Sequence, residues 1–350
     1  MLQITDIPVE GYECVKRAID TQSGLHAIIS VHSTVLGPAL GGMRMWPYES
    51  ETEALTDVLR LSKGMTYKAA CAGLELGGGK SVIIGDPAKK TDSLFESMGE
   101  FVESFGGRYI TAEDVNTKVE DMGVVRRRTE HVVGLEGKSG NPSPYTAWGV
   151  FLGLRAALEE VYGSDDLKDK VVALEGAGSV GSRYAELIAE RGGRIVVADI
   201  KEESARRVAE ATGGTVVRPE EIRSIPCDIY APCALGGSLN DETIPQLKAR
   251  IVCGAANNQL LEPRHGMALR ERGIVYGPDY VVNAGGLINV YNELVPGGYD
   301  EQRAMKMMEK IYTNMKQIFA ISREEGICTS VAADRFAERR IESARTRAEA

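Results

Sequence analysis

Long apolar runs are missing from this chain of 350 residues, and none approaches the roughly 20 residues that a membrane-spanning helix requires. The N-terminal stretch, MLQITDIPVEGYECVK, has neither a basic start nor an extended apolar core, so we expect no signal peptide. Basic charge is also scarce, because 41 Lys and Arg stand against 50 Asp and Glu, a formal net charge of −9. We therefore expect neither nucleic acid nor a membrane as a partner.

Paired cysteines and metal-ligand spacings are absent as well. No two of the six cysteines form Cys-x-x-Cys, and the four histidines show no ligand spacing with one another or with a cysteine. Scattered cysteines in a long chain are typical of reduced thiols in a reducing compartment. The sequence thus predicts a cytoplasmic protein without a metal site.

What is present is the composition of a globular protein, with 43% hydrophobic and 26% charged residues over a length that suits two domains. A cluster of Ser, Gly, Asn and Pro at 139–146, SGNPSPYT, marks the expected domain boundary. Before it, strand and helix patterns are mixed. The segment 25–35 alternates like a strand, and 50–70 has helical spacing with Ser50 as N-cap and Glu53 three residues on.

After residue 170 strands and helices alternate, which implies a parallel sheet covered by helices on both faces. We expect a helix after each strand. The predicted strand segments are KVVALEG, GRIVVAD, CDIYAP, ARIVCGAA and GIVYGPDYVVNAGG, and the chain from about residue 301 is predicted to be helical.

Lys80 follows three glycines and precedes a serine, which at first sight matches a phosphate-binding loop. That loop needs a glycine at position 74, where this chain has Leu74, and a helix after the Lys-Ser pair. The residues after Lys80 instead predict a short strand closed by a turn, so no helix N-terminus is available to receive a phosphate. We expect a Gly-rich turn to deliver the Lys80 ammonium for another purpose.

Residues 176–181 form a Gly-x-Gly-x-x-Gly motif between an apolar strand and the start of a helix. The next strand ends at Asp199, near the offset at which dinucleotide-binding folds place an acidic residue. In such folds the pyrophosphate lies at the helix N-terminus. Because the charge of Asp199 repels a 2′-phosphate, we expect NAD rather than NADP. The cofactor-binding residues predicted in this way are Gly176, Gly178, Ser179, Val180, Gly181 and Asp199.

The fold class that follows is α/β with two domains separated by a cleft. We expect an N-terminal α/β domain for substrate binding and oligomerisation at 1–138, completed by a C-terminal helix at about 325–350. Residues 139–324 are expected to form a NAD-binding Rossmann domain around a doubly wound parallel sheet.

Further stretches carry a longer and more specific pattern. They are LGPALGGMRMWPY (36–48), SKGMTYKAACAGLELGGGKSVIIGDP (62–87), YITAEDVN (109–116), SGNPSPYTAWGV (139–150), DIYAPCALGG (228–237), GAANNQL (254–260) and NAGGLINV (283–290). Together they resemble the glutamate/leucine/phenylalanine/valine dehydrogenase family nearly end to end, and its leucine, phenylalanine and valine dehydrogenases most closely. The resemblance implies a homo-oligomer that catalyses NAD-dependent reversible oxidative deamination of an L-amino acid to a 2-oxo acid, ammonia and NADH.

The same resemblance implies roles for single residues. Lys80 matches the catalytic lysine, Asp114 its acidic partner in proton transfer, and Lys68 the lysine that pairs with the substrate carboxylate. The other substrate positions it implies are Gly41, Gly42, Met65 and Asn258, with side-chain specificity at Leu40, Ala112, Leu287 and Val290. The positions it places at the nicotinamide half of the cofactor are Thr146, Cys233, Ala234 and Asn257.

The physical chemistry of two lysines suits these roles. Two ammonium groups in one closed cleft repel each other, and burial adds to the effect, so the pKa of one lysine falls and its neutral amine can act as a general base. We expect neutral Lys80 to activate a water that attacks the iminium left by hydride transfer. Asp114 would pass the proton to the departing amine, and closure about 139–146 would exclude water.

The specificity positions are all apolar, so none could receive a glutamate side chain. An apolar pocket discriminates by size, at only ~1–3 kcal/mol per methylene. We expect leucine, isoleucine and valine as substrates, with phenylalanine or tryptophan as the alternative. Two departures from the leucine-type pattern bear on the pocket, namely Asn116 where glycine is common and LINVYNE at 287–293.

Two other functions are compatible with parts of the sequence. A hydroxy-acid dehydrogenase would use a histidine–carboxylate pair, for which His131 and His265 are the candidates. A non-catalytic NAD-binding sensor would keep the dinucleotide motif but would not need Lys68, Lys80 and Asp114.

Overall fold

The computed structural model describes residues 1–135 and 137–349. The chain divides into two compact units, and the cut after Gly140 falls inside the 139–146 segment. The C-terminal segment of the first unit begins at Glu338, whereas the sequence predicts that it begins at about residue 325. Which unit binds which ligand stays a prediction. The first unit comprises Met1–Gly140, Val290–Tyr299 and Glu338–Ala350, and the second comprises Asn141–Asn289 and Asp300–Ala337.

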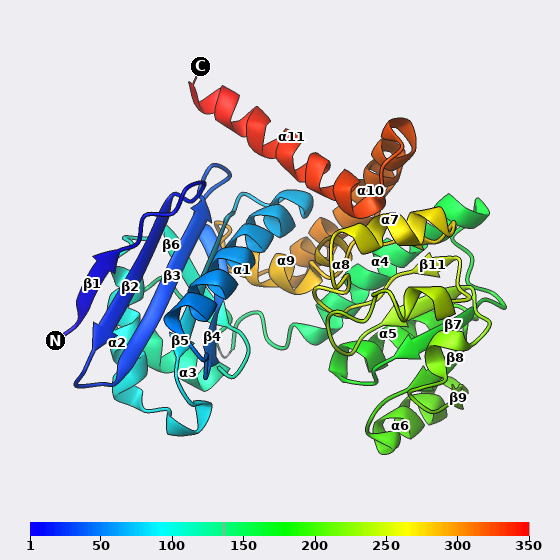
Figure 1. The fold of residues 1–350 in the computed structure, drawn as a ribbon, viewed down its shortest axis with the longest axis horizontal. Helices are drawn as coiled ribbons and strands as arrows, with labels where there is room; N and C mark the ends of the chain where they lie inside the picture. The colour runs from blue at the N-terminus through cyan, green and yellow to red at the C-terminus, as the bar shows by residue number, and fades with distance from the viewer. Residues whose placement is uncertain (136, 350) are drawn as a thin grey trace. The chain divides into compact units, whose positions relative to one another are not determined.

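A six-stranded mixed sheet forms the centre of the first unit (Figure 1). Its strand order is β1-β2-β3-β5-β4-β6. The pairs from β1 through β5 are antiparallel, whereas β4 runs parallel to both β5 and β6. The strands are β1 (Gln3–Asp6), β2 (Cys14–Asp20), β3 (Leu25–Ser33), β4 (Ala39–Trp46), β5 (Gly77–Ile84) and β6 (Tyr109–Glu113).

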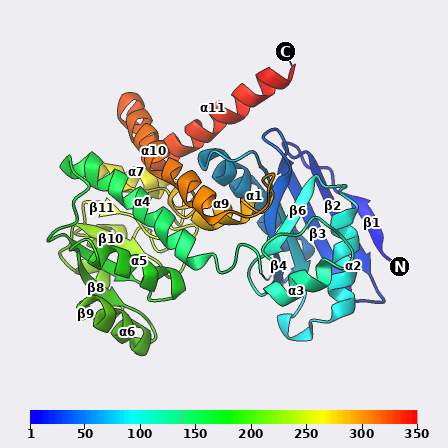
Figure 2. The same ribbon diagram turned by 180° about the vertical axis from the view of Figure 1, so that it is seen from behind.

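Helices cover both faces of this sheet. On one face α1 (Glu51–Cys71) packs against β5 and β3, and its Val58 contributes to an apolar cluster with Val82. On the other face α2 (Asp92–Glu103) and α3 (Val119–Val125) pack with the strands around a larger core (Figure 2). A 3-10 turn, η1 (Pro87–Lys89), precedes α2.

The predicted start of α1 is confirmed. The Ser50 hydroxyl accepts a hydrogen bond from the backbone N–H of Glu53 at 3.1 Å. The Glu53 carboxylate accepts from the N–H of Glu49 at 2.8 Å, one residue earlier than the expected capping box would have it.

The Gly-rich segment is a strand, so the predicted turn is wrong. Gly77, Gly78 and Gly79 begin β5 and lie buried between β3 and β4. A Cβ on Gly78 would overlap the backbone of Thr66 in α1, and one on Gly79 would lie 2.6 Å from the ring of Tyr109. These glycines therefore allow close approach to both faces of β5, which local composition cannot distinguish from a turn.

The second unit contains a fully parallel sheet in the order β9-β8-β7-β10-β11-β12. Numbered along this unit, that is the 3-2-1-4-5-6 order of a doubly wound dinucleotide-binding fold, so the predicted architecture is confirmed. The strands are β7 (Val171–Glu175), β8 (Arg194–Ala198), β9 (Thr215–Val216), β10 (Ile229–Pro232), β11 (Ile251–Val252) and β12 (Val275–Tyr276).

Helices flank this sheet, and Figure 2 shows α4 and α5 together beside it, in contact with each other. Two predictions of regular structure are wrong. Among the described residues, the link between β10 and β11 holds a 3-10 turn in place of the expected helix. Strand β12 ends at Tyr276, and a short helix begins at Asp279, because Pro278 cannot donate a hydrogen bond to continue the ladder. The helices are α4 (Ser143–Tyr162), α5 (Ser179–Ala189), α6 (Glu202–Thr212), η2 (Ile222–Ser224), η3 (Ile244–Gln246), α7 (Arg264–Glu271), α8 (Asp279–Val282), α9 (Gly285–Tyr291), α10 (Glu301–Glu325) and α11 (Thr329–Glu349).

In the part of the chain that the structure describes, no helix combines the length and the apolar character needed to cross a membrane.

Candidate active site

The first unit brings Lys80 and Asp114 together on the face of its sheet that α1 covers. Side chains alternate along a strand, so Lys80 shares a face with Gly78, the residue that packs against α1. Asp114 directly follows β6. The Lys80 Nζ lies 3.0 Å from the Asp114 Oδ1, which makes the two predicted catalytic residues a direct ion pair.

Gly41 and Gly42 on β4 leave room for this pair. A Cβ on Gly42 would lie 2.7 Å from the Cβ of Asp114, and one on Gly41 would overlap the carbonyl of Gly79. Any larger residue would displace the Asp114 side chain or the backbone of β5. These two glycines thus have a packing reason, beside the role in substrate binding that the family resemblance implies.

The environment of Lys80 makes the loss of its proton easier. The side chain is only 6% exposed, and burial lowers the pKa of Lys80 below its ordinary value. The carboxylate of Asp114 opposes that fall, while the Arg44 guanidinium adds to it. For Asp114, burial would raise the pKa, but the charges of Lys80 and Arg44 outweigh it and lower the pKa. The pair therefore combines an ionised carboxylate with an amine that loses its proton more readily than an exposed lysine.

Arg44 and Asp57 belong to this cluster, and neither was predicted from the sequence. The Arg44 Nε donates to Asp114 Oδ2 at 3.0 Å, and its Nη1 donates to Asp57 Oδ2 at 2.9 Å. The hydroxyl of Tyr48 donates to the same Asp57 oxygen at 2.7 Å. The sequence did contain a signal for Arg44. It lies two residues beyond Gly42, and residues two apart on a strand point to the same face of the sheet, so Arg44 could have been placed beside the predicted substrate residue Gly42.

The turn after β6 explains the unusual Asn116. This residue has a φ of 59°, and its Nδ2 donates to the carbonyl of Met45 at 3.1 Å. Thr117 Oγ1 accepts from the N–H of Asp114 at 2.9 Å and donates to the carbonyl of Met43 at 2.7 Å. Asparagine tolerates the left-handed backbone better than most residues, so it can replace glycine in the turn that presents Asp114.

The other predicted substrate residues are distributed over both units. Lys68 and Met65 are half-buried and lie three residues apart on α1. On neighbouring strands, Leu40 is buried and Ala112 is half-buried beside Gly42. Val290 belongs to the first unit, whereas Leu287 and Asn258 belong to the second, and their common role in one pocket stays a prediction.

The turn at 176–181 lies in the second unit between β7 and α5. Gly176 has a φ of 105°, and a Cβ on it would lie 2.7 Å from the backbone nitrogen of Ala234. A Cβ on Gly181 would overlap the carbonyl of Gly176. Gly178 differs, because its φ is −74° and nothing lies within 4 Å of a Cβ placed there. That open space at the N-terminus of α5, where Ser179 begins the helix and Val180 follows, fits a pyrophosphate.

Asp199 lies directly after β8 and is held by the same turn. Its Oδ2 accepts from the N–H of Ala177 at 2.7 Å, and its Oδ1 accepts from the N–H of Lys201 at 2.7 Å. Each oxygen keeps a further acceptor site for a ribose hydroxyl. The position and chemistry of Asp199 therefore fit the adenosine half of a dinucleotide.

The residues assigned to the nicotinamide half are engaged with their own unit. Burial raises the pKa of the Cys233 thiol to about 12, so it is a packing group rather than a nucleophile, and Ala234 beside it is exposed. Asn257 Oδ1 accepts from the Asn283 amide at 2.8 Å. The Thr146 hydroxyl donates to a carbonyl of the preceding turn at 3.0 Å. Cofactor contacts at these positions stay a prediction.

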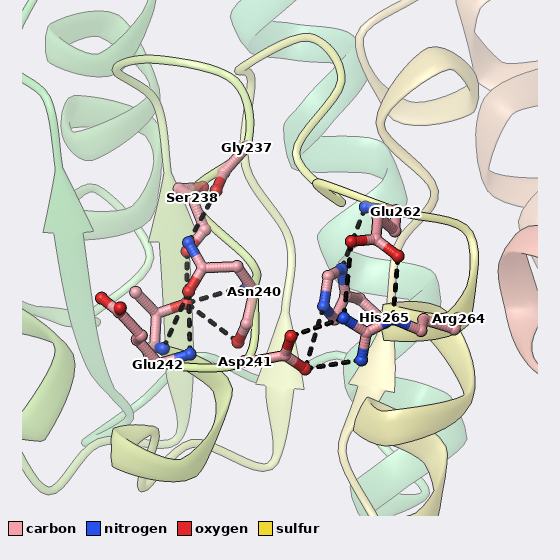
Figure 3. A network of polar contacts seen from close by, with 9 residues as sticks. Gly237, Ser238, Asn240, Asp241, Glu242, Glu262, Arg264 and His265 are labelled. Atoms are coloured by element: carbon pink, nitrogen blue, oxygen red, sulfur yellow. Dashed lines mark hydrogen bonds and ion pairs between the residues drawn. The ribbon is translucent and has the colours of Figure 1, made fainter.

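The candidate His265 forms a histidine–carboxylate pair, with a partner, Asp241, that the sequence alone did not indicate (Figure 3). Its Nε2 lies 3.3 Å from Asp241 Oδ1, and its Nδ1 accepts from the N–H of Glu262 at 2.9 Å. Arg264 also binds Asp241, with Nη1 2.7 Å from Oδ1. Because the ring is 1% exposed and both nitrogens face these partners, the network ties a loop to the start of α7 and offers no ring nitrogen to a substrate.

Among the described residues, no group of three or more His, Cys, Asp or Glu side chains could hold a metal ion. All six cysteines lie in this part of the chain, and none forms a disulfide. They are Cys14, Cys71, Cys227, Cys233, Cys253 and Cys328.

These features define a class of protein. A parallel sheet in the 3-2-1-4-5-6 order with a Gly-x-Gly-x-x-Gly turn is typical of nicotinamide-dinucleotide enzymes, and the other unit carries the ion pair between the buried amine of Lys80 and the carboxylate of Asp114.

Comparison with known proteins specifies the family. A family model described as "Glu/Leu/Phe/Val dehydrogenase, dimerisation domain" matches residues 12–131, and one described as "Glutamate/Leucine/Phenylalanine/Valine dehydrogenase" matches 196–347. The chain is 54% identical to the leucine dehydrogenase of Geobacillus stearothermophilus over 95% of this chain and 92% of the relative. It is 48% identical to the valine dehydrogenase of Streptomyces albus over 96% of this chain and 94% of that one.

Among solved structures, the crystal structure of L-tryptophan dehydrogenase from Nostoc punctiforme aligns with a TM-score of 0.87 and 47% identity, covering 96% of this chain and 97% of that one. The chain therefore belongs to the Glu/Leu/Phe/Val dehydrogenase family of NAD(P)-dependent amino-acid dehydrogenases. The family resemblance and the two-domain α/β fold expected from the sequence are confirmed.

Proposed function

We propose that this enzyme catalyses NAD-dependent, reversible oxidative deamination of an apolar L-amino acid, with leucine, isoleucine and valine preferred. The products are the 2-oxo acid, ammonia and NADH. The ion pair between buried Lys80 and half-buried Asp114 carries the proposal, because it supplies a base and a proton carrier at one point of the sheet. Identity of 54% to a leucine dehydrogenase supports the substrate class.

Lys80 acts as the general base in this proposal. Its lowered pKa allows a neutral amine to take a proton from a water molecule as that water attacks the substrate iminium. Asp114, ionised and 3.0 Å away, receives the proton and passes it to the amine that leaves as ammonia. The reverse sequence gives reductive amination of the 2-oxo acid.

The second unit holds the cofactor. When bound, NAD supplies the acceptor for the hydride that leaves the substrate Cα. The open position at Gly178 and the N-terminus of α5 accommodate the pyrophosphate, and Asp199 accepts hydrogen bonds from the adenine ribose. The negative charge of Asp199 favours NAD over NADP, because a 2′-phosphate would be repelled.

Lys68 pairs with the substrate carboxylate, beside Met65 and the glycines at 41 and 42. Leu40, Ala112, Leu287 and Val290 are the positions that the family resemblance assigns to the substrate side chain. Since these four are apolar, size rather than charge selects the substrate. Asn258 and Asn257 contact the substrate and the nicotinamide ribose, respectively.

A preference for phenylalanine or tryptophan is the alternative. The observation that favours it is the likeness to L-tryptophan dehydrogenase from Nostoc punctiforme, at 47% identity and a TM-score of 0.87. The apolar specificity positions are compatible with an aromatic side chain as well as a branched one.

We further propose that the enzyme is a cytoplasmic homo-oligomer that assembles through its N-terminal unit. The match of residues 12–131 to a segment described as a dimerisation domain supports this assignment.

A panel of L-amino acids, assayed with NAD and with NADP by the absorbance of the reduced cofactor, tests the proposal. We expect kcat/KM for leucine, isoleucine and valine to exceed that for glutamate by more than about 10³-fold, and NAD to be preferred. A higher kcat/KM for phenylalanine or tryptophan would establish the alternative. Dinucleotide binding without turnover of any amino acid would contradict the proposed reaction and support a sensor.

A further inference from the structure

Arg44 bridges two carboxylates on the sheet face that carries Lys80. Its Nε donates to Asp114 Oδ2 at 3.0 Å and its Nη1 donates to Asp57 Oδ2 at 2.9 Å, while Lys80 Nζ occupies the other Asp114 oxygen at 3.0 Å. We propose that Arg44 is a positioning residue that fixes Asp114 so that Oδ1 faces the Lys80 amine throughout the reaction. This inference rests on the proposed function.

The far end of the bridge is anchored. Asp57 on α1 accepts from the Tyr48 hydroxyl at 2.7 Å and pairs with Arg60 at 3.1 Å. The Arg44 side chain is 21% exposed, and its two hydrogen bonds hold it between α1 and the residue that follows β6. A carboxylate gripped at one oxygen by an anchored guanidinium cannot rotate about its Cβ–Cγ bond without losing a charge-assisted hydrogen bond.

The shape of the guanidinium matters as well as its charge. Arg44 serves two different carboxylates with two nitrogens of one rigid plane. A lysine in its place would bring one ammonium on a flexible stem, which could reach Asp114 or Asp57 but would not hold both in one geometry. Charge and positioning can therefore be separated by experiment.

The charge of Arg44 acts on the general base. It lowers the pKa of Lys80, in addition to the larger effect of burial and against the attraction of Asp114. The charged or titratable side chains on the elements around Lys80 include Asp114 after β6, Arg44 on β4, Asp57 and Lys68 on α1, and His32 on β3. Burial lowers the pKa of His32 to about 4, so this histidine is neutral in the range where the enzyme is assayed.

Three variants test the proposal in the full-length enzyme, which is assayed with its best amino acid and NAD. Arg44→Gln removes charge and bridge, Arg44→Lys keeps the charge, and Arg17→Gln is the matched control. Arg17 also links a strand to α1, through Glu51 at 3.1 Å, but it does not contact Asp114.

For Arg44→Gln we expect kcat of deamination to fall about 10²-fold with KM nearly unchanged, because a misplaced carboxylate slows proton transfer. The acidic limb of its pH–rate profile moves to higher pH, since the pKa of Lys80 rises when a neighbouring positive charge is removed. For Arg44→Lys we expect the acidic limb to stay at the wild-type pH, because the charge is kept, while kcat still falls about tenfold. The proposal would be overturned if Arg44→Gln kept the kcat and the acidic limb of the wild-type enzyme. It would also be overturned if Arg17→Gln lost as much kcat as Arg44→Gln.

Chemical rescue is measured within one variant, so its result does not depend on whether different variants fold equally well. Arg44 lines a cavity of about 740 Å³ together with Trp46, Tyr48, Asp57 and Arg60, so a small cation can enter from that side. In Arg44→Ala, millimolar guanidinium is expected to raise kcat about tenfold, whereas sodium chloride and urea at the same concentration have no effect. A folded Arg44→Ala enzyme that binds NAD but is not restored would contradict the positioning role.

A direct titration separates this inference from the proposed reaction. The 13Cε signal of Lys80 in 13C-lysine-labelled protein, assigned by its loss in Lys80→Met, is followed against pH in the wild-type enzyme and in Arg44→Gln. We expect the midpoint to rise in Arg44→Gln, whether or not an amino acid is turned over. Failure of the substrate panel would reject the proposed reaction alone, whereas an unchanged midpoint would reject the action of Arg44 on Lys80.

Discussion

Lys80 shows how the pKa of one side chain depends on its surroundings. Burial and Arg44 lower its pKa, while Asp114 raises it, and the net effect is a fall. The ordinary lysine is protonated at neutral pH and cannot act as a base. The sequence assigned Lys80 to catalysis by family resemblance, and the expected fall in its pKa was attributed to a second lysine and to burial. In the structure a nearby cation that lowers this pKa is Arg44.

We predict that deamination depends on the neutral form of Lys80. A lowered pKa means that the active, deprotonated fraction grows as pH rises, so kcat/KM should increase with pH and level off below the ordinary pKa of lysine. The measurement is kcat/KM for leucine against pH. A rate that falls as pH rises through this range would exclude a lysine base.

Replacing the base tests the same idea directly. Lys80→Ala is expected to lower kcat by about 10²–10⁴-fold, the usual contribution of a general base, and to abolish the acidic limb. Binding of NAD, followed by calorimetry, should persist because the dinucleotide turn lies in the other unit. The exposed Lys89→Ala serves as control and should retain wild-type rates. Retention of most activity by Lys80→Ala would remove the mechanism.

At the scale of elements, β5 contradicts what local composition predicts. Three consecutive glycines are typical of a turn, yet Gly77, Gly78 and Gly79 form the start of a central strand. The reason is non-local, since Thr66 of α1 and the Tyr109 ring approach from opposite faces and leave no space for a Cβ. By contrast, the start of α1 was predictable, because an N-cap depends only on residues within one turn.

We predict opposite effects of two Gly→Ala substitutions that bear on α1. Gly78→Ala forces α1 away from β5 and should lower the free energy of unfolding by about 3 kcal/mol or more, with loss of activity. Gly64→Ala places its methyl in open space on α1 and should stabilise the protein by up to about 1 kcal/mol. Denaturant unfolding followed by circular dichroism compares them. Equal stability of both variants would show that the glycines of β5 are not needed for packing.

At the scale of the whole molecule, the residues proposed for catalysis and those proposed for cofactor binding lie in different units. The first carries the ion pair of Lys80 and Asp114, and the second carries the dinucleotide turn and Asp199. The regular alternation after residue 170 was enough to predict the parallel sheet, because each strand and crossover helix is a local unit. The hydrogen bonds of Arg44 to Asp57 and Asp114 could not be predicted in this way, because those partners lie 13 and 70 residues away along the chain.

Because these residues lie in different units, we predict that replacing Asp199 changes the affinity for the cofactor without changing the first unit. Asp199→Ala loses charge-assisted hydrogen bonds to the ribose, each worth ~1.5–3 kcal/mol, so NAD affinity should fall about 10–100-fold. Binding of NADP should fall less, because repulsion of the 2′-phosphate is removed. Calorimetric titration with each dinucleotide measures this, and the exposed Glu210→Ala is the control in the same unit. An equal loss for both cofactors would reject Asp199 as the selecting charge.

The sequence by itself determined the class of the fold, the dinucleotide turn and the family, since these depend on motifs and periodicities within short stretches of chain. Only the tertiary structure decided that the glycines before Lys80 are a strand, that Asn116 fits a left-handed turn, and that Arg44 joins Asp57 to Asp114. The physical reason is the same in each case. Close packing and ion pairing act between residues that meet only after folding, so no local pattern records them.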